Sequence, residues 1–122
     1  MFLSACDDAT NGLTARAQKQ LHALGLREDL TDKFRYSYCA VISEGTVMAE
    51  KLGVETQEAS GTLQDGTFYF VSSSGYMAGS GSNIVLNGTE YSPAMRGFNI
   101  VVYDLRSQSV LTVRNFDTFI EP

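Results

Sequence analysis

The sequence predicts an α+β protein, in which a compact, β-sandwich-like body of two packed sheets has one main helix on its outside. Three observations lead to this class. Residues 13–25 place leucine and alanine at helical spacing, residues 98–103 and 110–113 are two strand-like runs with a polar connector, and residues 84–91 contain Asn-Gly between two further runs. With 122 residues, of which 43% are hydrophobic, the chain is long enough for one domain with a single core.

A short apolar run near the start of the chain ends in two aspartates. Residues 2–6 (FLSAC) precede Asp7 and Asp8, a pattern typical of a buried strand that leads into a polar loop. Adjacent side chains at a strand end point to different sides, so one of the two carboxylates is expected to face a cleft there. The alternative is that both only solvate the loop and cap the next helix.

The next elements complete a predicted β-α-β half, residues 1–52. The helix is expected over residues 13–25, with Thr10 or Asn11 as its N-cap and Gly25 as its C-cap.

A second strand is predicted after the helix, where residues 36–43 (YSYCAVIS) are rich in aromatic and β-branched types. As the second strand of a β-α-β unit, it should run parallel to the first. Residues 46–52 favour a further helical turn. Residues 53–66 are polar, rich in turn residues and without periodicity, so they are expected to form a linker inside the domain.

The second half, residues 67–122, is predicted to consist of antiparallel strands. Residues 68–71 are expected to form a strand, and residues 72–82 (SSSGYMAGSGS) a loop of small residues. In residues 84–91 the Asn-Gly pair accepts the positive φ angles of a tight hairpin turn. The runs at 98–103 and 110–113 should pair as another hairpin.

Net charge and hydrophobic pattern exclude several classes of partner, and the positions of the two cysteines indicate their state. The net charge is −5 and the pI about 4.7, so neither nucleic acid nor an anionic membrane is an expected partner. No apolar run of about eighteen residues is present, so membrane insertion is not expected either. Cys6 and Cys39 lie in apolar runs and are expected to be buried free thiols, unless the fold brings them together.

Residues 3–6 (LSAC) have the form of a lipoprotein processing site. Only five residues precede Cys6, too few for a charged region and an apolar segment, so lipidation is not expected unless the chain has been truncated. The compartment stays open.

The sequence offers little for catalysis or metal binding. His22, the one histidine, falls in the predicted helix, where a solvated position is more plausible than a catalytic one. One histidine and two separated cysteines do not make a familiar metal site. We therefore expect no enzyme activity, no cofactor and no metal. Arg35 and Arg96 each precede a predicted strand, and each alone could be a surface charge.

Several short motifs, taken together, resemble one known family. In the second half of the chain they are Gly75-Tyr76, residues 84–88 (IVLNG), residues 96–102 (RGFNIVV) and residues 116–118 (FDT). In the first half they are residues 2–8 (FLSACDD), Leu13, residues 21–25 and residues 34–38 (FRYSY). The set is similar to the interleukin-like EMT-inducer domain, also called the GG domain, of the FAM-three cytokine-like proteins.

The order of the two halves differs from the family pattern, in which the Arg-Gly and Phe-Asp-Thr half comes first. The difference resembles a circular permutation, which compact domains tolerate. An exchange of halves with a neighbouring chain is the alternative.

The resemblance implies a β-sandwich-like fold without catalytic machinery. Some family members are secreted signalling proteins, and others are non-catalytic modules of carbohydrate-active enzymes. In the stem of the O-mannose N-acetylglucosaminyltransferase, the module binds sugar. Matched motif by motif, its sugar-contacting positions fall on Asp7, Arg35 and Arg96, with Asp8 as a neighbour. The family has an aspartate where this chain has Tyr36, so the neighbouring side chain that would support Arg35 differs from the family pattern.

We therefore expect a lectin-like module that binds a glycan or glycoprotein. The alternatives are an assembly subunit of phage or virion appendage type, which would form a homo-oligomer or contact a neighbouring subunit, and a cytokine-like secreted signalling domain.

Overall fold

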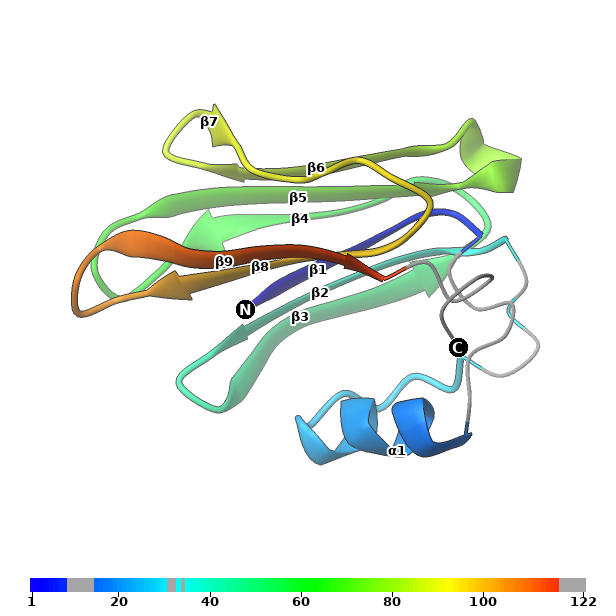
Figure 1. Cartoon of the computed structure of the whole chain (residues 1–122), viewed down its shortest axis with the longest axis horizontal. Coiled ribbons are helices and arrows are strands. Elements are labelled where there is room, and N and C mark those ends of the chain that lie inside the picture. The colour runs from blue at the N-terminus through cyan, green and yellow to red at the C-terminus, as the bar shows by residue number, and fades with distance from the viewer. Residues whose placement is uncertain (9–14, 31–32, 34, 117–122) are drawn as a thin grey trace.

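A mixed sheet of nine strands makes up most of residues 1–8, 15–30, 33 and 35–116, which the computed structural model describes (Figure 1). The strands are β1 (Phe2–Asp7), β2 (Ser37–Ser43), β3 (Thr46–Gly53), β4 (Gln57–Thr62), β5 (Phe68–Gly75), β6 (Gly81–Leu86), β7 (Thr89–Glu90), β8 (Gly97–Asp104) and β9 (Ser109–Phe116). A helix, α1 (Ala15–Ala23), and a short 3-10 helix, η1 (Tyr76–Ala78), complete this part of the chain.

Strand β1 lies at the centre of the sheet. One of its edges pairs antiparallel with β8 from Phe2 to Cys6. Its other edge pairs first with β2, antiparallel, and then with β5, parallel, at Cys6 and Asp7. The mainly β structure with one helix confirms the α+β class. Two separate packed sheets are not confirmed, because β1 joins all the described strands into one branched sheet.

The predicted parallel β-α-β unit in residues 1–52 is wrong. Strands β1 and β2 are antiparallel, with Leu3 opposite Ala40. A parallel return requires a crossover from one end of the sheet to the other. Here β2 starts at the end of the sheet where β1 stops. Helix α1 therefore belongs to an excursion at one end, seen below the sheet in Figure 1.

Three predicted irregular or helical segments contain strands. Residues 46–52 belong to β3, because Glu44 and Gly45, with φ of 51° and 75°, turn the chain back along β2. The predicted linker at residues 53–66 contains β4, an edge strand that pairs with β5. The predicted loop at residues 72–82 is mostly strand, since β5 extends to Gly75 and β6 begins at Gly81.

The hairpin predictions are confirmed. Asn87 and Gly88, with φ of 48° and 85°, form the tight turn between β6 and β7. The Asn87 side-chain oxygen also accepts a hydrogen bond from the Phe68 amide at 2.9 Å, which ties this turn to β5. Strands β8 and β9 pair antiparallel, with an irregularity after Val102.

Buried apolar residues form two clusters on opposite faces of the central strands. The first cluster lies between β1, β2 and β8 on one side and β4, β5 and β6 on the other; its members are Phe2, Cys39, Val41, Ala59, Leu63, Tyr69, Val71, Ile84, Leu86 and Val101. The second lies toward the helix side; its members are Leu3, Ala5, Leu26, Leu30, Tyr38, Ala40, Ile42 and Phe98. The alternation of side chains along each strand explains why neighbours such as Phe2 and Leu3 join different clusters.

The helix is confirmed as Ala15–Ala23, within the predicted residues 13–25. It has no buried residue, and Leu24, expected on its apolar face, is 40% exposed. The segment after the helix makes the deeper contact, through Leu26 and Leu30. Cys6 and Cys39 are buried free thiols, as predicted. Thr10, Asn11, Leu13, Phe34, Asp117 and Thr118, named in the sequence predictions, lie outside the described residues.

Candidate functional site

Two of the predicted site residues lie at the end of the sheet where β1 ends and β8 begins. Asp7 is the last residue of β1 and pairs in register with Gly75 of β5. On the opposite edge, the ladder between β1 and β8 reaches Cys6 and Gly97, so the next residue beyond this ladder on β8's side is Arg96. The backbones of Asp7, Gly75 and Arg96 therefore lie at the same end of the sheet.

Arg35 reaches the same end of the sheet through Gly75. A Cβ atom at Gly75 would collide with the backbone of Arg35 and Tyr36, so glycine allows this close approach. The Gly75 amide donates to Ser37 Oγ at 2.8 Å, which fixes the start of β2 against the end of β5. The backbones of Asp7, Arg35 and Arg96 thus lie at the same end of the sheet.

Tyr76 lies beside Arg35. The guanidinium carbon of Arg35 is 4.3 Å from the centre of the Tyr76 ring, within the range of a cation–π contact, and the Nε atom of Arg35 is buried. The Tyr76 side chain is nevertheless 56% exposed. The Arg35 guanidinium and the exposed Tyr76 ring therefore lie side by side at this end of the sheet.

Two asparagines position the backbone before β8. Asn99 is fully buried; its side chain donates to the Met95 carbonyl at 3.0 Å and accepts from the Met95 amide at 3.2 Å. The Asn115 side chain donates to the Arg96 carbonyl at 3.0 Å and to Asn99 Oδ1 at 3.2 Å. The backbone that presents Arg96 is thus fixed by β8 and β9 together.

Buried serines continue this polar layer beneath the strand end. Ser4 Oγ donates to the Ser72 carbonyl at 2.6 Å and accepts from Ser82 Oγ at 2.8 Å. The Ser73 hydroxyl donates to the Ala5 carbonyl. Since buried polar groups are costly unless paired, these bonds explain how strands so rich in serine can lie in the interior.

Left-handed backbone conformations gather near the same strand end. Asp7 and Arg35 have φ of 61° and 63°, and Ala94, two residues before Arg96, has φ of 54°. Such conformations cost a side-chain-bearing residue about 1–2 kcal/mol. Strained backbone of this kind is often found where side chains are positioned for binding.

The two aspartates at the end of β1 differ in burial. Asp8 is buried, with 7% of its surface exposed, whereas Asp7 is partly exposed. Asp7 is therefore the better placed of the two to accept hydrogen bonds from a ligand.

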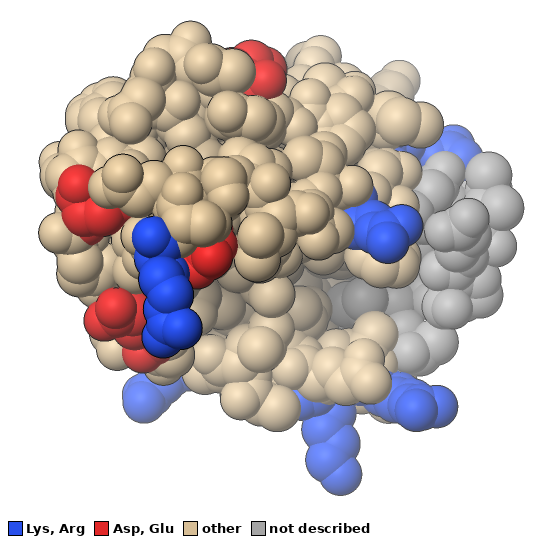
Figure 2. Space-filling view, turned by 60° about the vertical axis from the view of Figure 1, so that its left-hand side comes forward, with Lys and Arg blue, Asp and Glu red and all other residues tan. Residues whose placement is uncertain are grey.

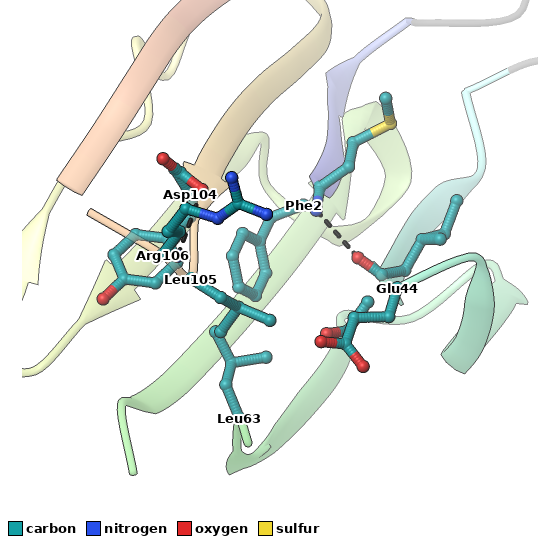
Figure 3. A pocket seen from close by; sticks show the side chains of 10 residues that line it. Phe2, Glu44, Leu63, Asp104, Leu105 and Arg106 are labelled. Atoms are coloured by element: carbon teal, nitrogen blue, oxygen red, sulfur yellow. Dashed lines mark hydrogen bonds between the residues drawn. The ribbon is translucent and has the colours of Figure 1, made fainter. Parts of the chain in front are cut away.

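The opposite end of the sheet has a cavity of about 560 Å³ (Figure 3). Its apolar wall includes Phe2, Leu63 and Leu105, and Figure 3 shows Arg106 and Glu44 on different sides of this wall. Figure 2, which turns this end of the molecule toward the viewer, shows acidic side chains near a basic one and no broad basic surface on this face. None of the predicted site residues lies in this cavity.

Next to this cavity, Asp65 is engaged in hydrogen bonds. The Thr67 amide donates to Asp65 Oδ1 at 2.9 Å, and the Tyr103 hydroxyl donates to Oδ2 at 2.8 Å. The hydrogen bonds from Thr67, and then the one from Tyr103, lower the pKa of the Asp65 carboxyl. This network closes the turn between β4 and β5 against β8.

His22 is exposed on α1, as predicted, and its ring nitrogen lies 2.8 Å from Gln18 Nε2. Among the described residues, no group of three or more His, Cys, Asp or Glu side chains could bind a metal ion. The described part of the chain also contains no helix long and apolar enough to span a membrane.

Comparisons of the chain with protein-family models, with curated proteins and with solved structures found no match.

The sequence predictions did not assign roles to Tyr76, Asn99 and Asn115. An asparagine within an apolar run, as in residues 98–103, is a signal that could have revealed Asn99, because a buried amide requires fixed partners. Tyr76 follows a glycine after a serine run, and nothing in that pattern indicates that its ring would contact Arg35.

Proposed function

We propose that this protein is a non-catalytic, lectin-like module that binds a glycan at the end of β1, in a permuted relative of the interleukin-like EMT-inducer domain. The observation that supports this proposal best is that the backbones of Asp7, Arg35 and Arg96, distant in sequence, lie at one end of the sheet. We also propose that the two parts of the branched sheet on either side of the first buried cluster correspond to the two layers of the family's β-sandwich. These parts are β1, β2 and β8 on one side and β4, β5 and β6 on the other.

The chemistry of these side chains suits sugar hydroxyls. A carboxylate accepts hydrogen bonds from two adjacent hydroxyl groups, and a guanidinium donates several in a fixed plane to ring, hydroxyl or acetamido oxygens. The buried amides and hydroxyls beneath the site fix the backbone, which lowers the entropy lost when a ligand binds. With one small site we expect Kd values of roughly micromolar to millimolar.

Titration of the ¹⁵N-labelled protein with N-acetylglucosamine and N-acetylgalactosamine, followed by NMR, tests the proposal. We expect shifts at the amides of Asp7, Gly75 and Gly97. Asp7→Asn and Arg96→Ala should each weaken binding about tenfold or more, because each removes a charged hydrogen-bonding group. Asparagine tolerates the left-handed backbone of Asp7, so the first variant should fold.

Arg114→Ala, which removes an exposed arginine of β9, is the matched control and should bind like the wild type. Binding that is unaffected by both Asp7→Asn and Arg96→Ala would show that the site is assigned wrongly.

A second candidate function, an assembly subunit, has support from β9. Strand β9 pairs only with β8 among the described strands, so its other edge has no strand partner in the described part of the chain. Leu111, Val113 and Phe116 of this strand are 62%, 41% and 48% exposed. Such an edge is suited to pairing with another chain. Light scattering tests this: an oligomer that Leu111→Lys dissociates supports assembly, and a monomer at all concentrations contradicts self-assembly.

A further inference from the structure

A second concave surface adjoins the candidate glycan site. It is a cavity of about 460 Å³ lined by Val54, Glu55, Thr56, Met77 and Ala78. Met77 and Ala78 directly follow Tyr76, whose ring contacts Arg35. Thr56 Oγ1 lies 2.8 Å from Ser74 Oγ, which ties the other wall of the cavity to the end of β5. The cavity and the candidate site therefore share the segment that begins at Gly75.

Apolar side chains are exposed here to an unusual degree. Tyr76 is 56% exposed, Met77 55% and Val54 45%. The Arg35 guanidinium lies over the Tyr76 ring, and the large exposed area of that ring is available to a ligand. Exposed aromatic rings of this kind commonly act as anchors in binding sites.

The composition of the cavity matches one pyranose unit. A sugar ring has an apolar face of C–H groups, which suits Val54 and Met77 of the cavity and the adjacent Tyr76 ring, and a rim of hydroxyl groups, which suits a carboxylate acceptor. The Glu55 carboxylate makes no hydrogen bond or ion pair with the residues that the structure describes. The negative charge of Glu55 should disfavour the binding of a negatively charged sugar in this cavity.

We infer that the ligand is at least a disaccharide, and that Tyr76 together with this cavity forms the subsite for its second, uncharged pyranose unit. The inference rests on the proposed function, since Asp7, Arg35 and Arg96 bind the first unit. Tyr76 lies at the boundary, next to Arg35 in the first subsite and to Met77 in the second.

A comparison of N-acetylglucosamine with its β-1,4-linked disaccharide, by NMR titration, tests the inference. We expect the wild type to bind the disaccharide about tenfold more tightly than the monosaccharide, which corresponds to one good ring contact. Tyr76→Ala should bring the ratio of the two affinities close to one, and because its ring also contacts Arg35, it should weaken monosaccharide binding as well. Tyr76→Phe should retain it, because the ring provides the contact.

The matched control is Phe68→Ala, which removes an aromatic ring that is 51% exposed at the opposite end of β5. It should leave the affinity ratio unchanged. Equal binding of both sugars by the wild type, or a ratio that survives Tyr76→Ala, would overturn the second subsite while the proposed function stands. Binding of neither sugar would overturn both.

Discussion

The Glu50→Ala substitution tests how the segment after α1 is held against the sheet. Glu50 Oε1 accepts a hydrogen bond from the Arg27 amide at 2.8 Å. Its Oε2 accepts from the Glu28 amide at 3.1 Å and from the Tyr38 hydroxyl at 2.7 Å. One carboxylate on β3 therefore connects this segment to β2, next to the point where Leu26 enters the core.

The expected loss in the free energy of unfolding is about 2–3 kcal/mol. The bond from the Tyr38 hydroxyl is partly buried and should contribute about 1.5 kcal/mol, whereas the two exposed backbone bonds should contribute about 0.5 kcal/mol each. Glu50→Gln should lose about half as much, because its amide oxygen still accepts while its amide nitrogen cannot.

Urea unfolding, followed by far-UV circular dichroism and tyrosine fluorescence, measures this loss. The chain has six tyrosines and no tryptophan, so tyrosine emission is directly visible. Glu58→Ala removes an exposed carboxylate of β4 and should change the stability by less than about 0.5 kcal/mol. If Glu50→Ala destabilises the protein no more than Glu58→Ala does, the assignment of these hydrogen bonds is refuted.

A double-mutant cycle separates the bond between Tyr38 and Glu50 from the other two. Tyr38→Phe and Glu50→Ala should show a coupling energy of at least about 0.5 kcal/mol. Burial, and then the hydrogen bond to Glu50, raise the pKa of Tyr38 above its ordinary value of 10.0. The unfolded chain therefore ionises first, and this contribution to stability is present below pH 10.0 and falls as the pH rises above it. A Tyr38 that ionises with the exposed tyrosines would contradict this.

Two further substitutions and one titration test the packing of the core and the residues that hold the backbone of the candidate site. Gly75→Ala should cost about 1–3 kcal/mol, because its Cβ meets the backbone of Arg35 and Tyr36. Gly81→Ala should be nearly neutral in the same urea assay, because its Cβ would make only an ordinary van der Waals contact with Ser74 Cβ, at 3.9 Å. Asn99→Ala should cost about 2–3 kcal/mol, since it leaves buried polar groups unpaired, and should weaken glycan binding in the NMR titration without touching the ligand. Burial raises the pKa of the Cys39 thiol from 9.0 to about 11, so this thiol should react slowly with a thiol reagent in the native protein. The stability that the buried, protonated thiol contributes should be lost as the pH rises from 9.0 to about 11, because the unfolded chain ionises first.

The hairpins could be predicted because their information is local. Asn87 and Gly88 accept positive φ angles at low cost, so the turn follows from two adjacent residues. The helix was likewise predictable from its spacing, although its packing was not. Its own side chains stay exposed or half-buried, and Leu26 and Leu30 beyond its end enter the core.

The elements that were missed depend on distant partners. Residues 46–53 (TVMAEKLG) include good helix formers, but the turn at Glu44 and Gly45 pairs them with β2 and overrides that propensity. The serines of β5 resemble a loop in sequence. Ser72 and Ser73 are buried because groups on β1, far away in the chain, supply their hydrogen-bond partners.

The candidate site also combines features that local sequence predicts with features that depend on distant partners. The sequence indicated that Asp7 ends a strand and that Arg96 precedes one. Their proximity depends on the register of β1 against β8, which sequence spacing does not specify. Arg35 and Gly75 meet only because β2 and β5 share a neighbour in β1.

The position of β1 predicts that both halves of the chain unfold together. β1 bonds to β2 in its own half and to β5 and β8 in the other, so neither half completes the sheet alone. Leu3→Ala, at a residue 1% exposed, should cost about 2–5 kcal/mol. In ¹⁵N spectra across a urea series, the native peaks of β3 and β6 should then vanish at one shared, lower midpoint. Separate midpoints for the two strands, in either protein, would mean that the halves are independent and that β1 does not couple them.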